Sequence, residues 1–305
     1  MATQKEIQVC FNPHFDAVSL WIGSFGGEDS PCDISRGVFG AKRGVPRLLE
    51  MFDRYGIKTT WGVTGNSMES FPKAAEMLVK SGHEIGIHGY MHENPLAMTR
   101  EQEEEVLDKT ISVVKKLTGK SPRGYMAPWW ELSPNTIELL GKYGITYDSS
   151  LMEDDYHPYY LRVGDSWTKI NYTGPAKDWM KPWKPGKLVD IVEIPASWWL
   201  DDAPPVMFVK ASANSHGWIT GRQLEEIWKD QFDWVYRHHD YAVFPVTIHP
   251  DASGKPHVLM MVERLIDYML SHSGVRMVTM EYMADDFRKR APFGSGKEVG
   301  GPSGL

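Results

Sequence analysis

The stretch Gly82-His83-Glu84-Ile85-Gly86-Ile87-His88-Gly89-Tyr90-Met91-His92 is the one from which the fold can be predicted. Residues 84–87 have the character of a short buried strand, and His88 and His92 follow it four residues apart. Two imidazoles at this spacing can bind one divalent ion when an oxygen ligand reaches them from elsewhere in the fold. The ordinary alternative is a pair of loop histidines that bond neighbouring carbonyl groups. A metal site is therefore favoured only if other strand ends supply polar partners.

Short apolar runs alternate with helical stripes of apolar residues along the chain. The runs that we predict to be strands are residues 7–11, 59–63, 84–87, 124–127, 145–148, 192–194, 242–248 and 275–279. The stripes that we predict to be helices are residues 44–55, 71–81, 100–117, 134–143, 221–237, 258–271 and 280–290. This alternation is typical of parallel strands covered by helices, with polar residues gathered just after the strands, as in α/β barrels.

Three segments lack this pattern. Residues 21–40 are rich in Gly, Asp and Ser, which predicts a long loop that covers the substrate. Residues 153–190 are rich in Asp, Tyr, Trp, Pro and Lys without helical periodicity, so we expect an excursion near the mouth of the fold. The tail from Pro292 onward has no apolar face and is expected to be disordered.

Composition and charge exclude several classes of protein. The 305 residues carry a formal net charge of −7, so we expect no binding to nucleic acid or to an anionic membrane. The first residues lack an apolar signal segment and nothing spans a membrane, so we expect a cytoplasmic protein. Cys10 lies in an apolar run, which favours a buried free thiol over a disulfide with Cys32.

Polar side chains follow four of the predicted strands. They are His14, Asp16, His88, His92, Asp148 and His249. Asp16 could add a carboxylate oxygen to the histidine pair, which gives a ligand set with positions left open for water. That set suits hydrolysis, because a divalent ion acidifies water and polarises a carbonyl group. His249 could donate a proton to a leaving nitrogen, or it could simply bond a backbone carbonyl.

These residues carry a resemblance to a known family, the polysaccharide deacetylases with the NodB homology domain. The matching elements are Asp16, the segment Gly82-His83-Glu84-Ile85-Gly86, the pair His88-x-x-x-His92, Ala127-Pro128-Trp129 and Thr247-Ile248-His249. The Ser24–Gly40 segment, Asn94-Pro95 and Trp130-Glu131 look closest to the intracellular branch of allantoinase-like proteins, cyclic imide hydrolases and a peptidoglycan deacetylase-like protein.

The resemblance implies a fold and a set of roles. The fold is a distorted (β/α)7-type barrel, with one catalytic domain over residues 1–291 and a disordered tail over residues 292–305. Asp16, His88 and His92 bind one divalent ion, usually Zn²⁺, and His249 acts as the general acid. The branch also implies a homo-oligomer, a dimer or a tetramer.

Two positions depart from the family pattern. His14 stands where the branch commonly has an aspartate that acts as general base, and Met126 stands where the wider family has an arginine. His14 could accept a proton or could be an additional metal ligand. Replacing a carboxylate by a neutral imidazole makes the site more positive by one charge, which suits a substrate with a good leaving group.

From this difference we expect a metal-dependent hydrolase that opens a small cyclic amide or imide, with His14 and His249 as catalytic residues. One alternative is a deacetylase of N-acetylated sugars or peptidoglycan fragments, and another is an inactive homologue that binds a ligand. The aromatic clusters predict a small enclosed pocket for a small-molecule substrate. The residues that we expect to bind it are Trp129, Trp199, Tyr147, Asp148 and Glu28.

Overall fold

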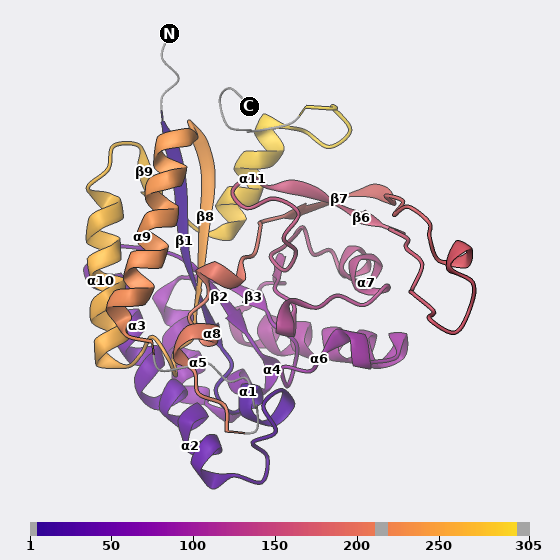
Figure 1. The fold of residues 1–305 in the computed structure, drawn as a ribbon. Helices are drawn as coiled ribbons and strands as arrows, with labels where there is room; N and C mark the ends of the chain where they lie inside the picture. Colours follow the sequence, from indigo (N-terminus) through magenta and orange to yellow (C-terminus); the bar gives the residue numbers. More distant parts are fainter. Residues whose placement is uncertain (1–4, 211–218, 298–305) are drawn as a thin grey trace.

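The centre of the fold is a curled sheet, seen in a computed structural model that describes residues 5–210 and 219–297 (Figure 1). Within these residues the strand order is β6-β7-β5-β4-β3-β2-β1-β8, and β9 pairs with β1. The β6–β7 pair is antiparallel and the other pairings are parallel. The strands are β1 (Glu6–Phe15), β2 (Thr60–Val63), β3 (Glu84–Ile87), β4 (Gly124–Tyr125), β5 (Tyr147–Asp148), β6 (Tyr159–Val163), β7 (Lys187–Glu193), β8 (Tyr241–Ile248) and β9 (Val275–Met277).

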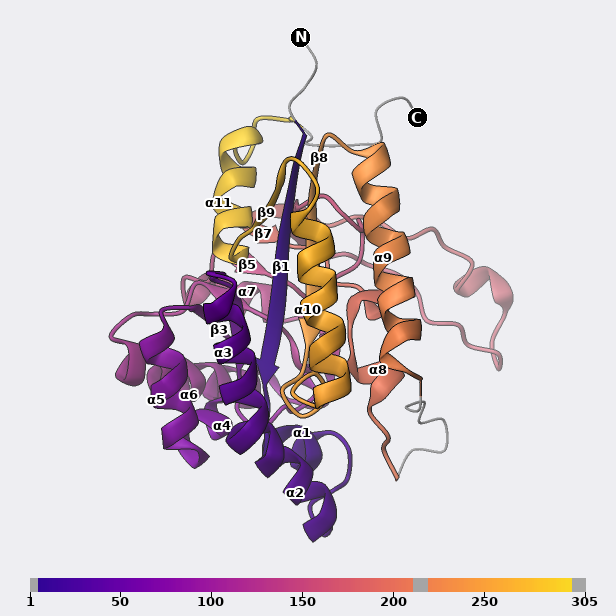
Figure 2. The ribbon, with the colours of Figure 1, turned by 90° about the vertical axis from the view of Figure 1, so that its left-hand side faces the viewer.

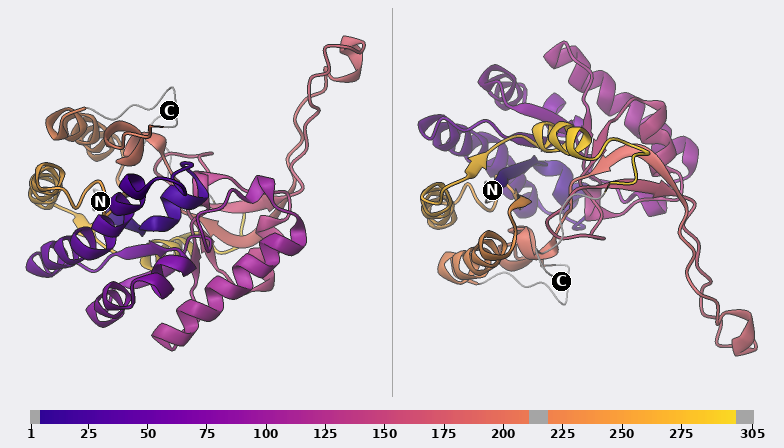
Figure 3. Two further views of the ribbon diagram at one scale, coloured as in Figure 1. Left: turned by 90° about the horizontal axis from the view of Figure 1, so that it is seen from below. Right: turned by 90° about the horizontal axis from the view of Figure 1, so that it is seen from above.

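Helices lie around the outside of the strands (Figure 3). The α-helices are α1 (Val18–Gly23), α2 (Pro31–Phe39), α3 (Val45–Arg54), α4 (Gly65–Ser70), α5 (Pro72–Ser81), α6 (Arg100–Thr118), α7 (Thr136–Lys142), α8 (Ala203–Val206), α9 (Gly221–His238), α10 (Pro256–Leu270) and α11 (Met280–Arg290). Shorter helical turns are η1 (Gly40–Gly44), η2 (Pro95–Ala97), η3 (Pro128–Trp130), η4 (Ala176–Asp178) and η5 (Trp198–Leu200). Most of their apolar faces pack on the strands in one large core, whereas α11 packs in a second cluster and α1 in a third.

The two sides of the sheet approach each other, so the sheet forms a half-barrel. The N–H of Val243 on β8 donates to the carbonyl of Tyr156, just before β6, at 2.9 Å. Asp201 forms an isolated parallel bridge with Thr247 near the end of β8. The predicted α/β fold, a distorted barrel in a single domain, is therefore confirmed.

Strand β1 lies in the middle of the parallel strands. Every residue of β1 except Glu6 is buried, because β8 covers one edge, whereas β9 covers the start and β2 the end of the other edge. Figure 2 shows β1 pointing toward α1 and α2. Parallel strands that run in one direction bring their carboxyl ends to one edge of the sheet, which is where ligands bind in such folds.

The prediction of a long loop over residues 21–40 is wrong, because this segment contains helix α2 and continues through η1 into α3. Ser30 caps α2 by accepting from the N–H of Asp33 at 3.2 Å, and Pro31 occupies the first turn. Gly37 allows close packing of this helix, since a Cβ there would lie 2.5 Å from the carbonyl oxygen of Ala17.

Residues 164–186, which we call the arm, connect β6 to β7. No residue from Arg162 to Asp190 is buried, and all of them belong to the described part. Figures 1 and 3 show the arm projecting from the body. The arm joins the start of β7. The mouth of such a fold lies at the carboxyl ends of the parallel strands, which is the other end of β7. The excursion that we expected near the mouth therefore begins at the opposite end of the sheet.

The remaining expectations about the chain ends and thiols have mixed outcomes. Cys10 is a buried free thiol, as predicted, and Cys32 is an exposed free thiol. The tail expected to be disordered lies mostly outside the described residues, since only residues 292–297 of it are described. Among the described residues, no helix is long and apolar enough to cross a membrane.

Candidate active site

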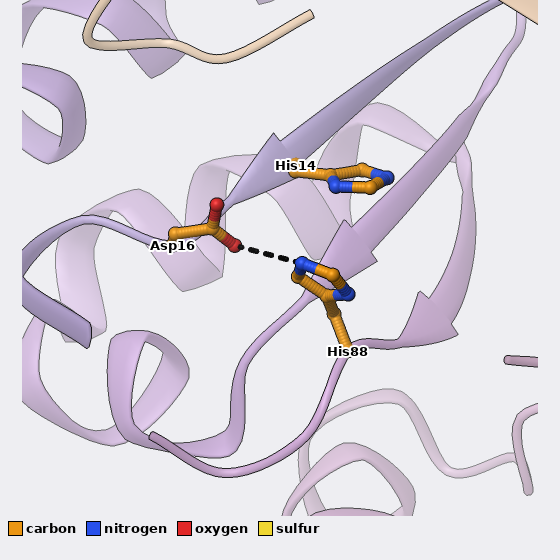
Figure 4. Close-up of side chains that lie close together, drawn as sticks. All are labelled: His14, Asp16 and His88. Atoms are coloured by element: carbon orange, nitrogen blue, oxygen red, sulfur yellow. Dashed lines mark ion pairs between the residues drawn. The ribbon is translucent and has the colours of Figure 1, made fainter. Parts of the chain in front are cut away.

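Five of the predicted site residues meet at the carboxyl ends of three strands. His14 and Asp16 come from the end of β1, His88 and His92 follow β3, and His249 follows β8. All five side chains are buried. Figure 4 shows His14, Asp16 and His88 converging. Because β1 lies between β2 and β8 in a parallel sheet, these separate sequence segments come together at one edge.

Asp16 and His88 form a pair that fits a cation. Oδ1 of Asp16 lies 3.7 Å from Nε2 of His88. Within the described residues, these two atoms and Oδ2 of Asp16 have no hydrogen-bond partner. Nδ1 of His88 donates to the carbonyl of Met126 at 2.8 Å, so Nε2 keeps its lone pair. Buried polar atoms without partners are costly, and a bound divalent ion would satisfy both residues.

His92 is held beside this pair by Ser24, a residue that the sequence analysis missed. The Ser24 hydroxyl donates to the carbonyl of His92 at 2.8 Å, and its oxygen also contacts Nδ1 of His92. Because the hydroxyl proton is already used, Nδ1 must donate to it, which leaves a lone pair on Nε2. The His92 ring lies 4.7 Å from the His88 ring, centroid to centroid.

His14 lies in one of two groups of possible ligand atoms among the described residues, the other being Asp201, Asp202 and His249. One atom each from His14, Asp16 and His88 lies within 4.8 Å of the others, among the residues that the structure describes. The centroids of the His14 and His88 rings are 4.3 Å apart. His14 is therefore close enough to Asp16 and His88 to be an additional ligand of the same ion.

His249 is oriented by an acidic pair that the sequence analysis also missed. Nδ1 of His249 donates to Oδ1 of Asp202 at 2.7 Å, and Asp201 lies 3.6 Å from the same nitrogen. Nε2 of His249 faces Oδ2 of Asp16 at 3.6 Å. The Asp201-Asp202 dipeptide was visible in the sequence, but only the bridge between Asp201 and Thr247 brings it beside His249.

The electrostatic environment separates His249 from the other histidines. Burial lowers the pKa of His249, but the charges of Asp201, Asp202 and Asp16 outweigh burial and raise it to about 10. Burial, followed by the neighbouring imidazoles, lowers the pKa values of His14 and His92 well below the usual range. The site therefore holds one cationic imidazole, that of His249, beside neutral ones. A cationic imidazole can donate a proton, and a neutral imidazole can bind a metal.

Backbone strain is concentrated at the same end of the fold. In the described chain, the non-glycine residues with positive φ are Ala17, His92, Trp129 and Trp130, with φ values of 48°, 60°, 63° and 50°. Such conformations cost about 1–3 kcal/mol each and persist where the surrounding structure holds them. The strain places the His92 and Trp129 side chains around one cavity.

That cavity has a volume of about 480 Å³ and opens above the histidines. It is lined by His14, Leu20, Ser24, Phe25, Gly26, His88, His92, Ala127, Trp129, Trp130, Trp198, Asp201, Ala203, Pro204, Met207, Val209 and His249. Its walls are mainly aromatic and apolar, and its polar groups gather at the histidines. This is the usual composition of a small-molecule site.

Only some of the expected substrate-binding residues line the cavity. Trp129 lines the cavity, but Trp199 is 73% exposed and lies outside the described lining. Its neighbour Trp198 lines the cavity instead, because adjacent side chains of the η5 turn point in different directions. The Trp199 carbonyl accepts a hydrogen bond from Trp228 at 2.9 Å, which anchors the turn. Glu28 is exposed and also lies outside the described lining.

Tyr147 and Asp148 lie behind the cavity and are absent from its described lining. Tyr147 is buried, and its hydroxyl donates to Glu84 on the far side of the sheet. Asp148 accepts from the hydroxyl of Ser150 at 2.6 Å, and Ser150 in turn accepts from the N–H of Ala127 at 2.8 Å. Asp148 therefore supports a residue of the cavity wall and does not itself reach a substrate there.

Comparison with known proteins agrees with this site. A sequence model described as polysaccharide deacetylase matches residues 33–147. The chain is 56% identical to the peptidoglycan deacetylase of Helicobacter pylori, over 94% of this chain and 98% of that protein. It is 38% identical to the peptidoglycan deacetylase-like protein FGM2 of Gibberella zeae, over 93% of this chain and 87% of that protein.

Solved structures show the same fold. A candidate polysaccharide deacetylase from Mycobacterium smegmatis superposes with a TM-score of 0.81 at 27% identity, covering 99% of this chain and 96% of that one. The allantoinase Puue superposes with a TM-score of 0.74 at 22% identity, covering 96% and 94%, and this likeness concerns the fold alone. The relatives favour the deacetylase alternative, and none of these comparisons supports the expected cyclic imide specificity. Because two relatives match over nearly their whole length, the chain belongs to the polysaccharide deacetylase family, hydrolases of carbon–nitrogen bonds.

Proposed function

We propose that the protein is a metal-dependent deacetylase that acts on N-acetylated sugar units of peptidoglycan or of fragments of it. The observation that carries the proposal is the pair of unpartnered buried groups, Asp16 and His88, at the base of an aromatic cavity. The relative at 56% identity, a peptidoglycan deacetylase, supports the choice of substrate class. This proposal replaces the expected ring opening of a cyclic imide.

Asp16, His88 and His92 are the residues that would hold a divalent ion, with Zn²⁺ as the expected metal. One carboxylate and two neutral imidazoles match the ligand preferences of zinc in hydrolases. When bound, such an ion acidifies water and polarises a carbonyl oxygen. The lone pairs of the two imidazoles are already directed by Met126 and Ser24. Fixed ring orientation of this kind raises metal affinity.

His249 is placed to give a proton to the departing nitrogen. Deacetylation consumes water, breaks the bond between the acetyl carbon and nitrogen, and releases acetate and an amine. The amine nitrogen is a poor leaving group unless it is protonated as the bond breaks. A pKa raised to about 10 keeps His249 protonated at neutral pH, and Nε2 is the ring nitrogen that faces the site.

The cavity suits one sugar unit better than a long polymer. Its volume of about 480 Å³ lies within the range of roughly 300–1,000 Å³ typical of small-molecule sites. Phe25, Trp129 and Trp130 offer aromatic faces for the apolar side of a sugar ring. The acetamido group would then point toward the histidines at the base.

Measurement of acetate release tests the proposal. Purified protein is incubated with N-acetylglucosamine oligomers and with peptidoglycan fragments, with and without a chelator. We expect acetate release that the chelator abolishes and that an added divalent metal restores. In parallel, succinimide, hydantoin and allantoin are followed for ring opening. Ring opening without acetate release would overturn the proposal in favour of an imidase, and no metal-dependent turnover of any amide would favour an inactive homologue.

A further inference from the structure

The tautomer of His14 is fixed by Asn12, two residues earlier on the same face of β1. Nδ2 of Asn12 donates to the carbonyl of Thr60 at 2.8 Å. A carbonyl oxygen can only accept, so this bond determines which end of the amide is nitrogen. Oδ1 of Asn12 therefore faces Nε2 of His14, at 2.6 Å. Since Oδ1 can only accept, Nε2 of His14 carries the proton and Nδ1 keeps a lone pair.

That lone pair lies on the side of the ring that faces the site. The Cδ2–Nε2 edge of His14 packs toward β2, since a Cβ on Gly62 would lie 3.0 Å from Cδ2 and 3.3 Å from Nε2. Nδ1 is on the other side of the ring. In Figure 4 the His14 ring lies beside Asp16 and His88. Ligand atoms of these three residues lie within 4.8 Å of one another.

We propose that His14 is a fourth protein ligand of the divalent ion, through Nδ1, and that Asn12 is the residue that positions it. The inference rests on the metal site of the proposed function. It assigns a metal-binding role to the position at which the family resemblance leads us to expect a carboxylate base. The side chain that replaces this base becomes part of the ion's coordination.

The three imidazoles near Asp16 share one arrangement, which supports this assignment. In each, one ring nitrogen donates to a fixed acceptor: Asn12 for His14, the Met126 carbonyl for His88 and the Ser24 hydroxyl for His92. Metal-binding histidines in proteins almost always donate their second N–H in this way.

A role as proton acceptor fits His14 less well. The ring is buried, and the nearest imidazoles are those of His88 and His249, whose centroids lie 4.3 and 5.4 Å away. A protonated His14 would add a positive charge to this buried group of imidazoles beside a bound cation, which is unfavourable. A neutral imidazole with a directed lone pair is, by contrast, a good donor to a metal.

Metal affinity, measured without substrate, tests the inference. Wild type, His14→Ala, Asn12→Ala and His239→Ala are titrated with Zn²⁺ against a chromophoric chelator, and circular dichroism confirms that each variant is folded. We expect His14→Ala to lose roughly 10-fold or more in affinity and Asn12→Ala to lose less. His239→Ala is the matched control, a buried histidine just before β8, at the end of that strand opposite the site, and it should keep the wild-type affinity.

The visible spectrum of the Co²⁺ form provides a second measurement. We expect His14→Ala to change the ligand-field bands and added imidazole to restore them, because a free imidazole can fill the place of the lost ring. If His14→Ala keeps both its affinity and its Co²⁺ spectrum, the inference is wrong and His14 acts elsewhere in the reaction. If metal binding depends on His14 but no substrate releases acetate, the proposed function fails and the ligand assignment stands.

Discussion

Asp202 holds His249 through both its ring and its backbone. Oδ1 of Asp202 accepts from Nδ1 of His249 at 2.7 Å, and the backbone N–H of His249 lies 3.0 Å from each carboxylate oxygen. Ser253 donates its hydroxyl to the remaining oxygen. The carboxylate is completely buried, so its charge acts on the imidazole with little screening by water.

The first prediction concerns this pair. Asp202→Asn should lower acetate release by roughly 100-fold or more, because the neutral amide neither favours the protonated imidazole nor fixes its tautomer. The sign follows from the charge: losing an anion lowers the pKa of His249, so the high-pH limb of the rate profile should move to lower pH. Rates measured across pH for Asp202→Asn and Asp201→Asn compare the bonded carboxylate with one 3.6 Å away. Equal effects of the two changes would show that the hydrogen bond has no special role.

Metal uptake should depend on pH through Asp16. Burial raises the pKa of Asp16 to about 7, an effect that nearby His249 opposes and that Asp251, Asp201 and Asp202 reinforce. Below that pH the carboxyl group is protonated and must lose its proton to bind a metal. His88 does not compete, since burial lowers its pKa to about 3. We expect apparent Zn²⁺ affinity to fall by about tenfold per pH unit below pH ~7.

Isothermal titration in buffers of different ionisation enthalpy checks this prediction, because it counts the protons released. We expect about one proton released per ion at pH 6. The variant Asp16→Asn removes the titrating group and provides the control. A pH-independent affinity in the wild type would contradict the assigned role of Asp16.

Trp129 and Trp199 give a matched comparison of a tryptophan that lines the cavity with one that does not. Trp129→Ala should raise KM by about 5-fold, the equivalent of about 1 kcal/mol of lost aromatic contact, with less effect on kcat. Trp199→Ala should leave KM unchanged, because its side chain is largely exposed and outside the described lining of the cavity. Steady-state kinetics on one N-acetylated substrate provides the measurement. A larger effect at Trp199 would mean that substrate extends beyond the cavity.

The arm provides a test of the expected homo-oligomer. Trp167, Tyr172 and Trp183 of the arm are 69%, 88% and 50% exposed, although contiguous exposed apolar surface is uncommon on monomers. The arm carries four lysines against two aspartates in a chain of net charge −7, so its charge is complementary to that of the rest of the molecule. We predict that the arm contacts a second copy of this chain.

Replacing residues 167–183 by Asn-Gly tests this, because Ser166 and Lys184 already pair across the two strands and a two-residue turn can join them. Light scattering after size-exclusion chromatography should show an oligomer for the wild type and a smaller species for the deletion. The control is Met260→Ser, which removes an exposed apolar side chain from α10. A monomeric wild type, or a deletion that keeps the oligomer, would contradict the prediction.

Local patterns in the sequence determined much of the fold and part of the site. Apolar runs followed by polar residues predicted the strands, and the spacing of His88 and His92 predicted their convergence, because both features depend on neighbouring residues. Strand alternation also places Asn12 and His14 on one face of β1. The parallel arrangement then brings Asp16 and His249 to the same edge as the histidine pair.

Only the tertiary structure decided which distant residues support the site. Asp202 reaches His249 across 47 positions, and Ser24 reaches His92 across 68, because of sheet closure and helix packing that no local pattern encodes. The same holds for Trp198, which lines the cavity in place of Trp199 because of the direction of a single turn. The sequence determined which chemical groups follow each strand, whereas the packing of the chain determined which group each one faces.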